Sequence, residues 1–118
     1  MPGVSIHVVD VSRGVVARGM RVELHSVDAG GTLALLAKGK IGANGLWNAP
    51  ELAKTFAAGG YAAIFHVADF YRAQGLALPA VPFLEAVRFD FGIADPARHY
   101  HLPFKCTPWG YSCFRGGA

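Results

Sequence analysis

The segment ADPARHYHLPFKCTPWGYSCFRGG, residues 94–117, carries the strongest folding signal in the chain. It begins with the turn pair Asp95-Pro96 and continues with residues 99–106, whose side chains alternate as in a β-strand. Thr107–Trp109 separates this stretch from a second strand-like stretch, residues 110–116. Two such stretches joined by a short turn indicate a strand pair. We therefore expect this segment to form the last two strands of a sheet.

The preceding residues repeat this pattern of short apolar stretches separated by turns. Residues 20–27 alternate between apolar and polar side chains, and Asn44-Gly45 is a strong turn signal. Residues 68–75 break the strand pattern, and their helix formers before Gly75 predict a short helix. Further strands are expected at residues 4–11, 32–40, 60–67 and 83–93. Seven to eight strands with one short helix predict an all-β fold, an antiparallel β-sandwich, in a single domain of residues 1–118.

Composition narrows the classes of function. The 118 residues are 53% hydrophobic and 16% charged, which excludes a disordered chain. The formal charge of +3 comes from scattered basic residues, so we expect no nucleic-acid partner. No apolar run of about 20 residues could span a membrane, and the N-terminus lacks the features of a signal peptide. Cys106 and Cys113 match no metal or redox motif, so free thiols and a cytoplasmic location are expected.

Three segments together resemble the transthyretin-like family of 5-hydroxyisourate hydrolases. IHVVDVSRGVVARGMRVEL, residues 6–24, is similar to the family's opening strand and turn. YAAIFHVADFYRAQG, residues 61–75, is similar to its strand-plus-helix passage. Residues 94–117 are the most specific, because they resemble the family's His-x-His-x-Pro strand, Pro-x-Gly-Tyr-Ser turn and terminal Tyr-Arg-Gly-Ser. The ordered combination covers most of the chain.

The resemblance implies a two-sheet sandwich, a homotetramer built as a dimer of dimers, and active sites where dimers meet. It also implies hydrolysis of the small cyclic ureide 5-hydroxyisourate, formed by urate oxidation, without a metal or organic cofactor. The family's polar set falls here on His7, His101 and Arg115. Two parts of the family's pattern differ: the loop arginine is Leu46, and in the terminal tetrapeptide the tyrosine and serine are Phe114 and Gly117.

This reaction suits imidazole chemistry. Opening a cyclic amide with water needs a base, donors for the developing oxyanion and an acid for the leaving nitrogen. An imidazole whose pKa is near 6.5 serves as either base or acid at neutral pH. Taken singly, His7 or His101 would be a hydrogen-bonded strand histidine, but their joint fit to the family pattern favours catalysis. We expect Arg115 to orient an anionic substrate.

The other histidines are expected to have structural roles. His99-x-His101 could seat zinc, because alternate strand residues share a face, but further ligands are not evident and no metal site is expected. His25 and His66 match no part of the family's polar set. His99 is expected to be a packing residue or to support a neighbouring catalytic residue rather than to act as the catalyst.

Lys105 and two apolar residues complete the expected substrate-binding set. Alternation puts Lys105 on the face of His101, about 13 Å further along the strand, where it could replace the family's loop arginine as a counter-charge. A solvated surface lysine is the alternative. Leu46 and Phe114 are expected to make the pocket more apolar than the family's.

Three functions therefore remain open. The first is hydrolysis of 5-hydroxyisourate or a related cyclic amide. The second is a diverged paralogue whose apolar pocket opens or closes another ring in secondary metabolism. The third is a non-enzymatic carrier of small molecules, against which the presence of both His7 and His101 argues.

Overall fold

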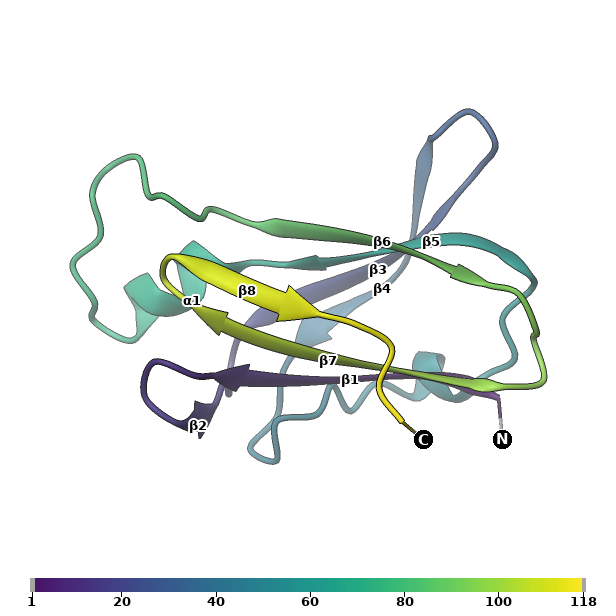
Figure 1. Ribbon diagram of the computed structural model, residues 1–118, viewed down its shortest axis with the longest axis horizontal. Helices are drawn as coiled ribbons and strands as arrows, with labels where there is room; N and C mark the ends of the chain where they lie inside the picture. The colour runs from purple at the N-terminus through teal and green to yellow at the C-terminus, as the bar shows by residue number, and fades with distance from the viewer. Residues whose placement is uncertain (1, 118) are drawn as a thin grey trace.

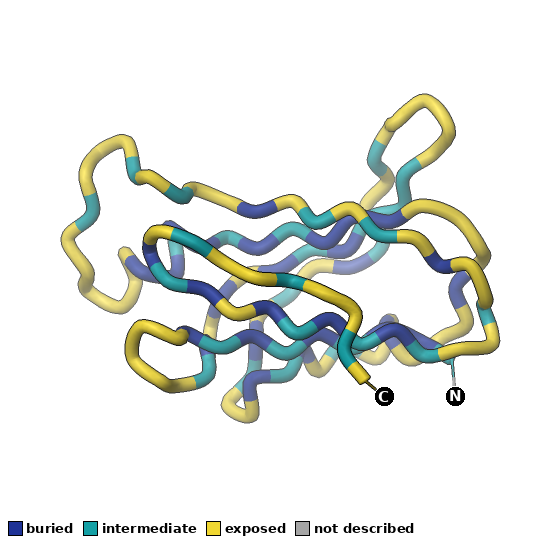
Figure 2. The backbone as a smooth tube through the Cα atoms, in the orientation of Figure 1, coloured by how far each residue is buried: buried dark blue, intermediate teal, exposed yellow. Residues whose placement is uncertain are grey.

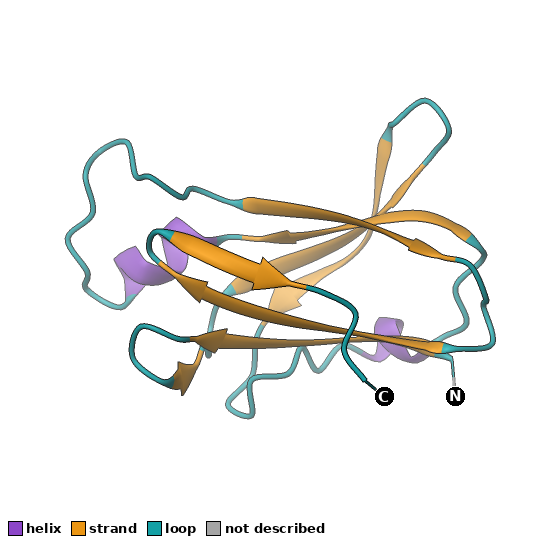
Figure 3. Cartoon of the chain, viewed as in Figure 1, coloured by secondary structure: helices purple, strands orange, loops and turns teal. Residues whose placement is uncertain are grey.

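A computed structural model describes residues 2–117 as two stacked four-stranded sheets (Figure 1). The first sheet has the order β2-β1-β7-β8 and the second the order β4-β3-β5-β6. The strands are β1 (Gly3–Asp10), β2 (Val15–Val16), β3 (Arg21–Val27), β4 (Leu33–Lys40), β5 (Gly59–Phe65), β6 (Val87–Ile93), β7 (His99–Thr107) and β8 (Gly110–Cys113). A 3-10 turn, η1 (Pro50–Ala53), and one α-helix, α1 (Val67–Ala73), accompany them (Figure 3). The expected sandwich with one short helix is confirmed.

The pairing of β1 with β7 is parallel, whereas the other strand pairs among the described residues are antiparallel. It runs from Gly3 opposite His99 to Asp10 opposite Cys106. Parallel neighbours need a long connection, and here the whole second sheet lies between them in the sequence. This pairing brings the first strand of the chain beside the strand in the 94–117 segment.

Side-chain alternation in β1 and β7 divides the first sheet into two faces (Figure 2). The inner face is buried against the second sheet, and Phe104 of β7 stacks on Phe65 of β5 with ring centroids 3.9 Å apart. Buried inner residues of these two strands are Val4, Ile6, Val8, Tyr100, Leu102, Phe104 and Cys106. The outer face of both strands is only partly covered, so polar residues there stay accessible.

Two details of the sequence prediction were wrong. The strand expected at residues 83–93 begins at Val87, and Phe83 is 81% exposed. The partner strand β5 ends opposite Val87, and the Glu85 carbonyl instead accepts a hydrogen bond from Ala68 at the start of α1. A tyrosine in the Gly-Tyr-Ser turn is also predicted to pack between the sheets, but Tyr111 stacks on Phe104 and is 52% exposed because β8 is an edge strand.

The short β2 strand and the η1 turn were not expected from the sequence. Each is too short to leave an alternating or helical period. The two cysteines are free thiols, as expected, with Cys106 buried and Cys113 partly buried. Across residues 2–117, no helix is long and apolar enough to cross a membrane.

Candidate functional site

His7 and His101 lie close together on the outer face of the first sheet. The parallel register places Ser5 opposite His101 and His7 opposite Pro103, so the two histidines are diagonal neighbours on adjacent strands. His7 lies near enough to His101 to contribute to the lowered pKa of His101. Strand alternation alone puts each side chain on this face, whereas the β1–β7 pairing brings them together.

The loop before η1 crosses β1 at His7. Val8 N–H donates to the Gly45 carbonyl (2.9 Å), and Trp47 N–H donates to the Ile6 carbonyl (3.0 Å). These bonds flank the pair His7–Leu46 and make it a non-hydrogen-bonded antiparallel pair, in which facing side chains are closest. The Leu46 side chain is therefore beside His7, at the position where the family's arginine was expected.

Gly45 in this loop leaves no room for a side chain. Its φ is +82°, in the left-handed region that glycine adopts without cost. A Cβ atom there would lie 2.5 Å from His7 Nε2 and 2.7 Å from a methyl carbon of Val16. His7 Nε2 itself donates to the Asn44 carbonyl (3.2 Å). The Asn44-Gly45 turn thus holds the ring of His7 from one side.

The segment after β8 packs against His101 in a similar way. Gly116 N–H donates to the His101 carbonyl at 2.7 Å, and the pair keeps the β7–β8 register that aligns Cys113 with Phe104. Pro103 has no N–H, which interrupts the ladder between these two points. A Cβ on Gly116 would lie 2.9 Å from His101 Cδ2 and 2.9 Å from Pro103 Cγ. In Figure 1 this segment runs from the end of β8 along β7.

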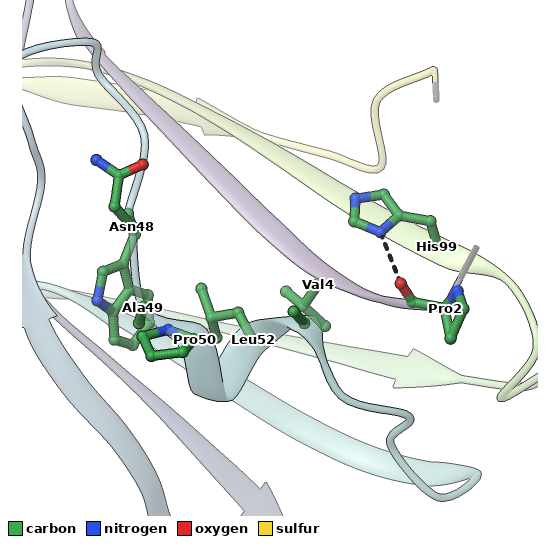
Figure 4. Close-up of a pocket in the computed structure, with 9 residues that line it drawn as sticks. Pro2, Val4, Asn48, Ala49, Pro50, Leu52 and His99 are labelled. Carbon is green, nitrogen blue, oxygen red and sulfur yellow. Dashed lines mark hydrogen bonds between the residues drawn. The ribbon is translucent and has the colours of Figure 1, made fainter.

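A chain of hydrogen bonds leads away from His101. The Ser5 hydroxyl lies 2.6 Å from His101 Nδ1 and 2.8 Å from His99 Nε2. His99 Nδ1 lies 3.3 Å from the Pro2 carbonyl, the contact drawn as a dashed line in Figure 4. His99 also lines a pocket of about 590 Å³, whose other walls are mostly apolar and include Trp47 and Leu52.

The environment of His101 favours its neutral form. Burial lowers the pKa of His101 below its usual value of 6.5, and the nearby His7 and His99 rings lower it further whenever they are protonated. A neutral imidazole at pH 7 has one free lone pair and can accept a proton. His101 is therefore available as a base where it meets the outer face.

Arg115 has a different position from the histidines within one chain. In the β7–β8 register it lies opposite Leu102, whose side chain is buried. Its guanidinium carbon is 4.0 Å from the centre of the Tyr100 ring, and an Nη atom donates to the His99 carbonyl at 3.2 Å. The structure thus brings the backbone of this terminal segment to His101, but not the guanidinium group.

Lys105 and Phe114 lie together further along the outer face. Lys105 is exposed and on the face of His101, as alternation predicted, and its ammonium is 5.8 Å from the centre of the Phe114 ring. Such a separation permits a cation–π attraction. Sequence reasoning missed Ser5, Gly45 and Gly116, although Ser5 could have been found from its two-residue spacing to His7.

His25 on β3 and His66 at the N-terminal end of α1 are not part of this arrangement. Both contact the carboxylate of Glu23, and their hydrogen bonds lower its pKa despite partial burial. Among residues 2–117, no three His, Cys, Asp or Glu side chains are grouped so that they could hold a metal ion. These two histidines form a separate hydrogen-bonded cluster around Glu23.

Known proteins resemble the chain over nearly its whole length. The family model described as "HIUase/Transthyretin family" matches residues 4–116. The 5-hydroxyisourate hydrolase 2 of Rhizobium meliloti is 37% identical over 111 residues, covering 93% of this chain and 92% of that protein. The 5-hydroxyisourate hydrolase of Deinococcus radiodurans is 37% identical over 116 residues, with coverages of 98% and 96%.

Two solved structures have the same fold. The 5-hydroxyisourate hydrolase of Klebsiella pneumoniae superposes with a TM-score of 0.80 at 28% identity, covering 99% of this chain and 100% of that chain. A structure of (S)-allantoin synthase gives a TM-score of 0.86 at 30% identity, covering 98% of this chain but 43% of that longer chain.

Proposed function

The chain belongs to the HIUase/transthyretin family, and from this premise we propose that it hydrolyses 5-hydroxyisourate in urate degradation. The observation that carries the proposal is the pair His7 and His101, placed side by side on an accessible sheet face. Relatives matched over more than nine-tenths of both chains carry the name of this hydrolase. The proposed role of the pair is proton transfer at neutral pH.

The proposed reaction is attack of water on a ring carbonyl. Neutral His101 takes a proton from the water as the oxygen bonds to carbon, and the imidazolium returns it to the leaving ring nitrogen. His7 shares these transfers from the adjacent strand. Because its Nε2 donates to the Asn44 carbonyl, its Nδ1 holds the free lone pair when the ring is neutral.

The substrate-binding residues are also proposals. Leu46 beside His7 offers an apolar contact, and Lys105 over Phe114 offers a positive charge on the same face. Arg115 would orient an anionic substrate after its guanidinium leaves Tyr100 or when a neighbouring subunit approaches. Lys105→Ala should weaken substrate binding, and an unchanged affinity and turnover would remove Lys105 from the site.

A homotetramer formed by pairing dimers is the assembly we propose. β8 and β6 are edge strands of the two sheets, and exposed edges are commonly covered by partner strands. Light scattering after size exclusion tests this, since a fully active monomer of 12.5 kDa would refute it. We also propose a cytoplasmic location, because both cysteines are free thiols and a reducing compartment preserves them.

A coupled assay tests the hydrolase activity. Urate and urate oxidase generate 5-hydroxyisourate, and the purified protein should accelerate the decay of its absorbance. His101→Asn should lower the rate by roughly 100-fold or more. His66→Asn, at the N-terminal end of α1, is the matched control and should leave it unchanged. Decay no faster than the spontaneous rate with the unmodified protein would contradict the proposal.

Leu46 favours a second candidate, a diverged hydrolase for a less polar cyclic substrate. The leucine occupies the place beside His7 where the family's arginine was expected, and the adjacent residue Trp47 lines the mostly apolar pocket. In a hydrolase adapted to such a substrate, Leu46→Arg should raise turnover of 5-hydroxyisourate. An unmodified protein as fast as its Leu46→Arg variant would favour the first candidate.

A further inference from the structure

We infer that Ser5 and His99 form a hydrogen-bonded relay that fixes the tautomer of His101 and leaves its Nε2 lone pair free for the substrate water. The inference rests on the proposed function for its catalytic meaning, but the relay itself is a property of the resting protein. Ser5 and His99 are positioning residues here, since they act through His101.

The direction of the relay follows from its last acceptor. The Pro2 carbonyl can only accept, so the bond at 3.3 Å requires the proton of neutral His99 to be on Nδ1. His99 Nε2 is then an acceptor, and the Ser5 hydroxyl donates its one proton to it at 2.8 Å. The Ser5 oxygen can therefore only accept from His101, at 2.6 Å. His101 must carry its proton on Nδ1.

The strands hold these groups in place. Ser5 is opposite His101 in the β1–β7 register, and His99 is two residues before His101 on the same face of β7. Pro2 precedes the first residue of β1, which is itself opposite His99. Figure 4 shows the His99 ring pointing from β7 toward the Pro2 carbonyl at the edge of the pocket. The Ser5 hydroxyl contacts the His101 ring directly, and the bonds from Ser5 to His99 and from His99 to Pro2 orient that hydroxyl.

The relay also serves the charged state of His101. When Nε2 takes a proton from water, the ring becomes an imidazolium and its Nδ1–H becomes a stronger donor. The bond to the Ser5 oxygen strengthens accordingly, because hydrogen bonds with an ionised partner are about twice as strong. A neutral resting state agrees with the lowered pKa that burial gives His101. Without Ser5, the proton would be free to move to Nε2 and block the base.

Nitrogen NMR of the histidine-labelled full-length protein tests the tautomer directly. The signals of His101, assigned with His101→Asn, should report Nδ1–H in the unmodified protein at a pH where the ring is neutral. Ser5→Ala removes the acceptor, and His99→Phe frees the serine proton to point at Nδ1, so both should shift His101 toward Nε2–H. Ser5→Thr and His99→Gln keep the needed oxygen or acceptor and should keep Nδ1–H. Ser26→Ala, on β3, is the control.

Kinetics provide the second measurement. Ser5→Ala should lower kcat by roughly 10- to 100-fold with KM nearly unchanged, and Ser5→Thr should restore most of it. Nε2–H in the unmodified protein, or an unchanged His101 tautomer in both Ser5→Ala and His99→Phe, would overturn the relay. Absent turnover with the expected NMR pattern would instead refute the proposed function and leave the relay intact.

Discussion

Replacing Gly45 by alanine separates the folding role of this loop from its role at the site. Two costs arise, and they differ in kind. At a φ of +82°, the left-handed conformation costs any residue with a Cβ about 1–2 kcal/mol of free energy. The new Cβ would also lie 2.5 Å from His7 Nε2, where ordinary contacts begin at 3.4 Å. His7 must therefore move by about 1 Å, a misplacement that can lower a rate roughly 100-fold.

Gly14→Ala is the matched control, because its φ is +69° and nothing lies within 4 Å of its Cβ position. Gly14→Ala should lower the melting temperature by roughly 5–10 °C for a domain of this size, and Gly45→Ala should lower it further because its Cβ also meets His7 and Val16. Only Gly45→Ala should also reduce kcat in the 5-hydroxyisourate assay, by 10- to 100-fold. Equal loss of activity in the two variants, or full activity of Gly45→Ala, would refute the contact with His7.

Three further outcomes are expected. Under the proposed hydrolase function, Leu46→Arg should not raise kcat/KM for 5-hydroxyisourate, measured by the initial decay of its absorbance. A several-fold rise would favour the second candidate, a hydrolase for a less polar substrate. Burial lowers the pKa of His101, so kcat/KM should fall as the pH drops through a midpoint below 6.5 in the pH–rate profile. A midpoint above 6.5 would contradict the role of His101 as a neutral base. Tyr71→Phe removes one hydrogen-bond donor to the fully buried Asp10 carboxylate and should lower the free energy of unfolding by about 1–3 kcal/mol, measured in urea. An unchanged urea midpoint would mean that the bonds from Ser12 and Arg13 are enough to stabilise the carboxylate.

Local patterns predicted the faces of the strands well. The alternation in 99–106 put His101 and Lys105 on one face, and the structure confirms it. The pairing of β1 with β7 could not be read from a local pattern, because no turn joins them and their register depends on the whole second sheet. The family resemblance grouped His7 with His101, whereas the alternation did not.

The differences near the site have local physical causes. Arg115 was expected at the histidines, but continuation of the β8 register past Pro103 puts it opposite the buried Leu102. The strand expected from residue 83 lacks a partner there, because β5 ends opposite Val87 before the turn into α1. At both places the neighbouring strand determines where the residues lie, and the pairing of strands cannot be predicted from the local pattern of a single sequence.

The parallel β1–β7 pairing also sets an order of events as the polypeptide leaves the ribosome. β3, β4, β5 and β6 are synthesised consecutively, so the second sheet can pair as soon as residue 93 emerges. β1 is made first and can pair early with the two-residue β2, yet its long partner β7 comes only with residues 99–107. Until then the edge of β1 that faces β7 is unpaired, and unpaired strand edges are prone to aggregate and to engage chaperones. The two catalytic candidates therefore meet in one of the last steps of biogenesis, and translational pausing before β7 would prolong the vulnerable stage.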